Sequence, residues 1–136
     1  MRTSRKATPA LIVIADQDED ERCLLRAVLK LKGFRVIEAR DGQEAIELAI
    51  NKRPDLLVMD LKLSRVSGTA AIRQIRKRAD LRNLPIVAVS STRSARGRRA
   101  PSGRSTAHLD KPIEYGDLDG LLDRFLPGQG LPLTRP

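Results

Sequence analysis

Three short apolar runs constrain the fold of this chain more than any other feature. They are Leu11–Ala15, Leu56–Met59 and Ile86–Val89. Each run is continuously hydrophobic, partly β-branched and too short for a helix, which is typical of a strand buried on both faces of a sheet. The chain therefore needs other elements to cover both faces of that sheet.

The segments between these runs have the spacing of amphipathic helices. The first begins at Asp18 and Glu21, which have the spacing of a capping box, and Gly33 is placed to end it in a left-handed cap. One stripe of that helix consists of Leu24, Leu25, Val28 and Leu29. We expect this stripe to pack on the sheet.

Three more helices and two weaker strands complete the pattern. The helical stripes lie within 45–49, 71–75 and 118–126, and the strands are expected at Phe34–Ala39 and Ala107–Asp110. Such alternation predicts βαβ units, whose right-handed crossovers give a parallel sheet with helices on both faces. We expect one doubly wound α/β domain at residues 10–126, a basic extension at 1–9 and a disordered tail at 127–136.

The segment from Arg93 to Arg104 breaks the alternation. It contains five arginines with Gly97, Pro101 and Gly103, and it has no acid and almost no apolar residue. A helix there would have no stripe to bury, so we expect the fourth helix of the domain to be degenerate or missing.

Composition narrows the classes of protein to consider. Cys23 is the only cysteine, so the chain has neither a disulfide framework nor a cysteine metal cluster. The longest apolar run is far too short to span a bilayer, and no signal-peptide core follows the basic N-terminus. We expect a cytoplasmic protein without a membrane partner. The net charge of +9 attracts anions, but the arginines lack the interleaved aromatics of single-strand binding, so we do not expect a nucleic-acid partner.

Polar side chains follow the predicted strands at their carboxyl ends, where open α/β sheets bind ligands. A carboxylate there can act as a nucleophile toward a phosphoryl group, and carboxylates together with waters suit Mg²⁺. A lysine and a hydroxyl can contact further phosphoryl oxygens. The sequence therefore predicts phosphoryl-transfer chemistry at Asp16, Gln17, Asp60, Ser90 and Lys111.

The ordered set of segments resembles the receiver domains of response regulators in two-component signalling. The resemblance covers about Ala10 to Leu126 and implies a flavodoxin-like sheet of strand order 2-1-3-4-5 and a cis Lys111–Pro112 bond. It also implies a stand-alone signalling module, not an enzyme, that takes phosphate from a histidine kinase or histidine phosphotransfer protein and switches an output protein. The segments that carry it are Ile14–Asp18, Lys32–Phe34, Ala39–Ala45, Pro54–Asp60 with Gly68, Pro85–Ser90 and Asp110–Pro112.

The resemblance assigns a role to each residue of the site. Asp60 is expected to accept the phosphoryl group, Ser90 and Lys111 to act as catalytic or switch residues, and His108 to be a candidate switch. The ligands expected for Mg²⁺ are Asp16, Asp60, the backbone carbonyl of Lys62 and, as a weakened position, Gln17.

Gln17 is the main departure from the family pattern. Receivers generally carry two acids after the first strand, and the second is usually a direct metal ligand. Gln17 brings an oxygen but no charge, so we expect weakened Mg²⁺ binding. Asp18 can substitute only if the loop shifts.

Three functions stay open at this point. The first is a receiver that is phosphorylated on Asp60. The second, favoured by Gln17, is a pseudo-receiver that binds protein partners without phosphorylation. The third is a nucleic-acid- or polyanion-binding protein that uses the arginine segment. The sequence names no cognate kinase, output partner, pathway or oligomeric state.

Overall fold

The computed structural model describes residues 8–91 and 104–130 of the chain. In these ranges the strands form one parallel sheet with the order β2-β1-β3-β4-β5, as expected. The strands are β1 (Leu11–Ala15), β2 (Arg35–Ala39), β3 (Leu56–Asp60), β4 (Ile86–Ser90) and β5 (Ala107–Asp110). The fold class predicted from the sequence is confirmed.

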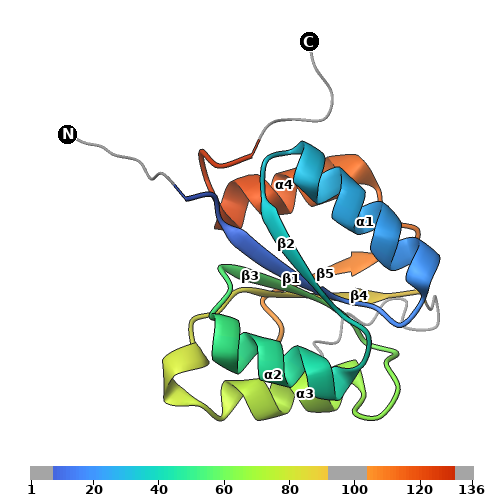
Figure 1. Cartoon of the computed structure of the whole chain (residues 1–136), viewed down its shortest axis with the longest axis vertical. Coiled ribbons are helices and arrows are strands. Elements are labelled where there is room, and N and C mark those ends of the chain that lie inside the picture. Colours follow the sequence, from blue (N-terminus) through green and yellow to red (C-terminus); the bar gives the residue numbers. More distant parts are fainter. Residues whose placement is uncertain (1–7, 92–103, 131–136) are drawn as a thin grey trace.

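Helices cover both faces of this sheet (Figure 1). The helices α1 and α4 lie on one face, and α2 and α3 lie on the other. Their bounds are α1 (Glu19–Leu31), α2 (Gly42–Lys52), α3 (Gly68–Arg76) and α4 (Tyr115–Phe125), with a short 3₁₀ helix at Ala79–Leu81. No helix in the described ranges is long and apolar enough to cross a bilayer.

The strand β1 shows how one run serves two cores. Every residue of β1 is buried, and successive side chains point to opposite faces of the sheet. Ile12 and Ile14 pack into the cluster that includes residues of α1 and α4. Val13 and Ala15 pack into the cluster beneath α2 and α3. This double burial is the reason why the run is apolar throughout.

The helix α1 begins and ends where expected, and Leu25, Val28 and Leu29 of its predicted apolar stripe are buried. Asp18 is its N-cap, and Gly33 has a φ of +98°, which fits the predicted left-handed position. The expectation that Leu24 faces the core was wrong, because Leu24 is 57% exposed. Two charged residues are buried as well, Arg22 on the helix and Lys32 directly after its end, and a search for apolar spacing does not place them inside.

Some expectations fall outside the described residues. These include the arginine segment apart from Arg104, residues 1–7 of the N-terminal extension and residues 131–136 of the tail. Residues 127–130 of that tail are described. A Cβ atom on Gly130 would lie 2.6 Å from the Phe34 ring, so this part of the chain lies close to the end of α1.

Candidate functional site

The register of the parallel strands brings the predicted polar residues to one edge of the sheet. Asp60, the last residue of β3, is paired with Val89 of β4, and Ser90 is paired with Asp110 of β5. Asp16 directly follows β1, whose last residue pairs with Ala39. Because all five strands run in the same direction, these carboxyl ends share one edge.

Asp60 is a buried acid held by the backbone around it. It is 6% exposed, and its Oδ1 accepts a hydrogen bond of 2.9 Å from the backbone N–H of Lys62. The first turn of α3 packs closely against it: a Cβ on Gly68 would lie 2.3 Å from the Asp60 carbonyl oxygen. Glycine at this position is therefore required by the close approach of two backbones.

Asp16 is also buried and equally constrained. Its Oδ1 accepts the Asp18 N–H at 2.9 Å, and its carbonyl oxygen accepts a 2.7 Å bond from Nη1 of the buried Arg22. Burial is the main cause that raises the pKa of Asp16 to about 6, and the negative charge of Asp60 adds to it. The Asp18 N–H and Lys111 lower that pKa and offset part of the rise.

Lys111 joins the acids from the end of β5. Its Nζ lies 2.9 Å from Asp60 Oδ2, 3.2 Å from Asp16 Oδ2 and 2.5 Å from Glu21 Oε1. Burial alone would lower the pKa of Lys111, but the hydrogen bonds to Glu21 and Asp60 raise it above its ordinary range. The ammonium therefore stays charged.

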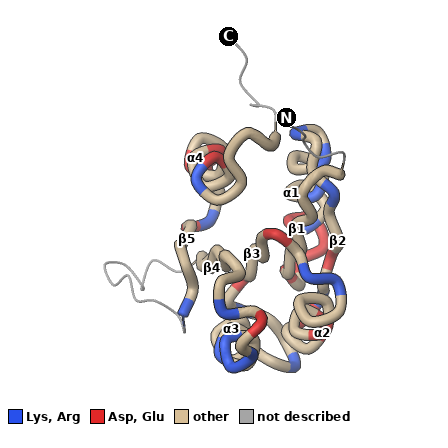
Figure 2. The backbone as a smooth tube through the Cα atoms, turned by 90° about the vertical axis from the view of Figure 1, so that its left-hand side faces the viewer, with Lys and Arg blue, Asp and Glu red and all other residues tan. Residues whose placement is uncertain are grey.

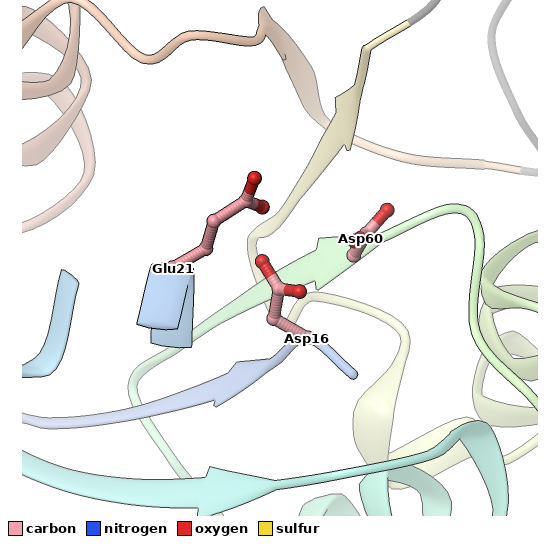
Figure 3. A group of neighbouring side chains, drawn as sticks. All are labelled: Asp16, Glu21 and Asp60. Atoms are coloured by element: carbon pink, nitrogen blue, oxygen red, sulfur yellow. The ribbon is translucent and has the colours of Figure 1, made fainter. Parts of the chain in front are cut away.

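Glu21 is a site residue that the sequence analysis missed. It was assigned only to the start of α1, yet its carboxylate turns toward Asp16 and Asp60 (Figure 3). The signal was available: in a parallel α/β sheet, the helix after a strand starts at the same edge where that strand ends. A residue in its first turn is thus placed beside the site.

A pocket of about 260 Å³ opens beside Asp60. Its lining residues are Asp60, Leu61, Lys62, Ser90 and Ser91. The predicted hydroxyl of Ser90 and the segment at Lys62 thus share one hollow with the Asp60 carboxylate.

Three further residues were singled out by sequence. Gln17 is exposed. Asp18 uses its Oδ1 to accept the Glu21 N–H at 3.0 Å as the cap of α1. His108 is exposed on β5, with its Nδ1 3.7 Å from Asp110 Oδ1.

The donors of the acidic cluster fit Mg²⁺. One carboxylate oxygen from each of Asp16, Glu21 and Asp60 lies within 4.8 Å of the others. An octahedral Mg²⁺ with Mg–O bonds of about 2.1 Å places opposite ligands about 4.2 Å apart, so small side-chain movements suffice. All three acids already share one cation, the ammonium of Lys111.

A group of positively charged residues lies at α3. Figure 2 shows Lys and Arg along α3, where Arg73, Arg76 and Lys77 line a pocket with Arg104. Arg76 is used in packing: it donates to the Leu81 carbonyl at 3.0 Å and to Thr106 Oγ1 at 3.2 Å.

Comparison with known proteins places the chain in a family. Residues 12–123 match the family described as response regulator receiver domain. The polar-differentiation response regulator DivK of Brucella anthropi is 32% identical over 106 residues, which are 77% of this chain and 86% of that protein.

Two solved structures share the fold. One is the receiver domain of a sensor histidine kinase from Pseudomonas aeruginosa, with a magnesium ion coordinated in its active site cleft. It has a TM-score of 0.78 and 26% identity, over 87% of this chain and 98% of that one. The other is the receiver domain of a Saccharomyces cerevisiae response regulator, crystallised with its histidine phosphotransfer signalling protein. Its TM-score is 0.77 at 22% identity, over 89% and 91% of the two chains.

Proposed function

The chain belongs to the response-regulator receiver family, the phosphorylation-dependent switches of two-component signalling, and we propose that Asp60 is the residue that accepts the phosphoryl group. The observation that carries this proposal is the surroundings of the Asp60 carboxylate. One of its oxygens is held by the Lys62 N–H, the other by Lys111, and the same carboxylate lines a pocket.

These residues have distinct tasks in the transfer. A carboxylate oxygen of Asp60 attacks phosphorus, so an O–P bond forms while the P–N bond of a phosphohistidine donor breaks. Lys111 offers its ammonium to a phosphoryl oxygen, and the Ser90 hydroxyl in the same pocket donates to another.

Mg²⁺ is the cofactor that we propose for this step. Asp16 and Asp60, with the carbonyl of Lys62, would hold it, and it would neutralise charge that develops on the phosphoryl oxygens. The receiver from Pseudomonas aeruginosa, with magnesium in its cleft, supports this choice. Gln17 contributes no charge, so the affinity of the two-acid set alone would be low.

Receivers interact with histidine kinases or phosphotransfer proteins, and we propose such a protein as the cytoplasmic phosphoryl donor of this chain. The complex from Saccharomyces cerevisiae shows a receiver of this fold with a phosphotransfer partner. In this role the chain is a switch read by an output protein, not an enzyme that turns over a metabolite. Ser90 lies between the pocket and β5, so it is the residue proposed to relay phosphorylation toward His108.

Intact-mass measurement tests the assignment of Asp60. Incubation with a small acyl or amido phosphate and Mg²⁺ should add one phosphate, labile to base and hydroxylamine, to the parent protein. Asp60→Asn should abolish the gain completely. Asp110→Asn is the matched control, because Asp110 ends β5 at the same edge but its side chain is 86% exposed.

A phosphate gain retained by Asp60→Asn would refute the assignment. A parent protein that gains none would favour the second candidate, a pseudo-receiver that binds its partner without phosphorylation. The observation in favour of that candidate is Gln17, which leaves the metal position after Asp16 uncharged.

A further inference from the structure

We infer that Glu21 supplies the third carboxylate of the Mg²⁺ site and replaces the charge that Gln17 lacks. This inference rests on the proposed function, because it concerns the same site. It assigns a metal-binding role to a residue in the first turn of α1, four positions after the glutamine.

The capping of α1 leaves Glu21 free for this role. In a capping box, the third helical residue reaches back to accept the N–H of the N-cap residue. Here Asp16 Oδ1 accepts the Asp18 N–H at 2.9 Å. Asp18 in turn accepts the Glu21 N–H at 3.0 Å, so the start of the helix is satisfied without the Glu21 side chain.

The freed side chain points into the site. Figure 3 shows the Glu21 carboxylate facing those of Asp16 and Asp60. Its Oε1 lies 2.5 Å from Lys111 Nζ, and its side chain is half-exposed and long enough to adjust by the small distance that an ion requires.

Charge also favours Glu21 over its neighbours. Asp16, Asp60 and Glu21 carry three negative charges against one positive charge on Lys111, so the cluster retains an excess that a divalent cation can neutralise. Asp18, the acid that directly follows Gln17, is committed to the helix cap. Glu21 is therefore the residue that restores a three-acid site.

Mg²⁺ titration followed by amide NMR shifts tests the inference without relying on phosphorylation. Glu21→Gln should raise the Mg²⁺ dissociation constant by about tenfold or more, because affinity follows the number of charged ligands. Glu19→Gln is the matched control: it removes the same charge from the same turn. The Glu19 side chain has no hydrogen bond or ion pair in the described part of the chain, so we expect a change within about twofold.

A double-mutant cycle separates a ligand from a general charge effect. Adding Gln17→Asp restores the acid after Asp16, and the loss caused by Glu21→Gln should then shrink to about twofold. An equal loss in both backgrounds would overturn the inference. Lys111→Met tests the other route: if the Glu21 effect vanishes without Lys111, Glu21 acts only by holding the lysine, and the inference fails.

Phosphate uptake, measured on the same samples, keeps this inference apart from the proposed function. If Glu21→Gln binds Mg²⁺ as tightly as the parent while Asp60 is phosphorylated, the role of Glu21 is wrong and the receiver function stands. If the parent binds Mg²⁺ and Glu21→Gln loses it, but Asp60 takes no phosphate, the metal site stands and the phosphorylation proposal fails. A parent that binds no Mg²⁺ overturns the inference.

Discussion

At each end of α1 a lysine lies beside one or more acids, but the two ends differ in the balance of charge. At the N-terminal end, Lys111 faces Asp16, Glu21 and Asp60. At the C-terminal end, Lys32 is 4% exposed and pairs with Asp119 of α4, one charge of each sign.

This difference in charge balance distinguishes a structural ion pair from a cation-binding site. A balanced buried pair can only be weakened by adding an ion, because neither charge is in excess. An acidic cluster that retains net negative charge after pairing gains from a further cation. We therefore expect that changes at Lys32 affect stability alone, whereas changes at the N-terminal end affect ligand binding and pH dependence.

Removal of Lys32 should have the largest effect on stability. Lys32→Met leaves the Asp119 carboxylate without its cation in a largely buried position, and breaking a buried pair in this way costs about 3 kcal/mol. The backbone bonds that Lys32 makes to Val28 and Leu29 should persist. Urea denaturation measures the loss in unfolding free energy.

The double variant Lys32→Met/Asp119→Leu serves as its control. It removes both charges, so it should recover most of the lost stability. Mg²⁺ binding of the double variant should equal that of the parent. A weaker Mg²⁺ affinity of the double variant would mean that the two ends of α1 are coupled, and the expectation that Lys32 affects stability alone would be wrong.

The acidic end should give the metal-free protein an unusual pH dependence. The pKa of Asp16 is raised from 3.8 to about 6, so the folded protein binds this proton more tightly than the unfolded chain does. The unfolding free energy of the metal-free protein should therefore rise as the pH falls through 6, by about 1 kcal/mol between pH 8 and pH 5. This gain in stability is complete below pH 3.8, the pKa of Asp16 in the unfolded chain, and it is lost as the pH rises through about 6.

Asp16→Asn should remove this pH dependence, and the difference between the two proteins in urea titrations at each pH isolates it. Saturating Mg²⁺ should reverse the sign of this pH dependence in the parent protein, because the ion competes with the proton for the same carboxylate. A parent and variant with parallel pH profiles would show that Asp16 titrates in its ordinary range.

Much of the fold could be predicted because local patterns and sheet physics agree. The runs that became β1, β3 and β4 are apolar throughout since both faces of each strand are buried. The positions of the Asp18 cap and Gly33 followed from backbone chemistry alone. The burial of Arg22 could not be predicted, because its partners, Glu38 of β2 and the Asp16 carbonyl, are brought to it only by the folded sheet.

The site was predictable in its parts but not in its full membership. The positions of Asp16, Asp60, Ser90 and Lys111 could be predicted from where each strand ends, since the parallel topology places these residues at one edge of the sheet. Glu21 was not found, because its direction depends on which group caps the helix. That detail appears only when the Asp18 N–H is seen to bind Asp16 instead of Glu21.

The smallest effect is expected at Lys30, two residues before Lys32 and still within α1. Its side chain is exposed in the last turn of α1. A positive charge there interacts favourably with the helix dipole and stabilises the helix by about 0.3–1 kcal/mol. Lys30→Met should therefore lower the unfolding free energy by less than about 0.5 kcal/mol in moderate salt and leave Mg²⁺ binding unchanged. The change of residue is identical to that in Lys32→Met, so urea denaturation of the two variants compares a buried, paired lysine with an exposed one. Equal losses at both positions would show that the Lys32–Asp119 pair contributes no more than a surface charge, and the contrast between the two ends of α1 would not hold.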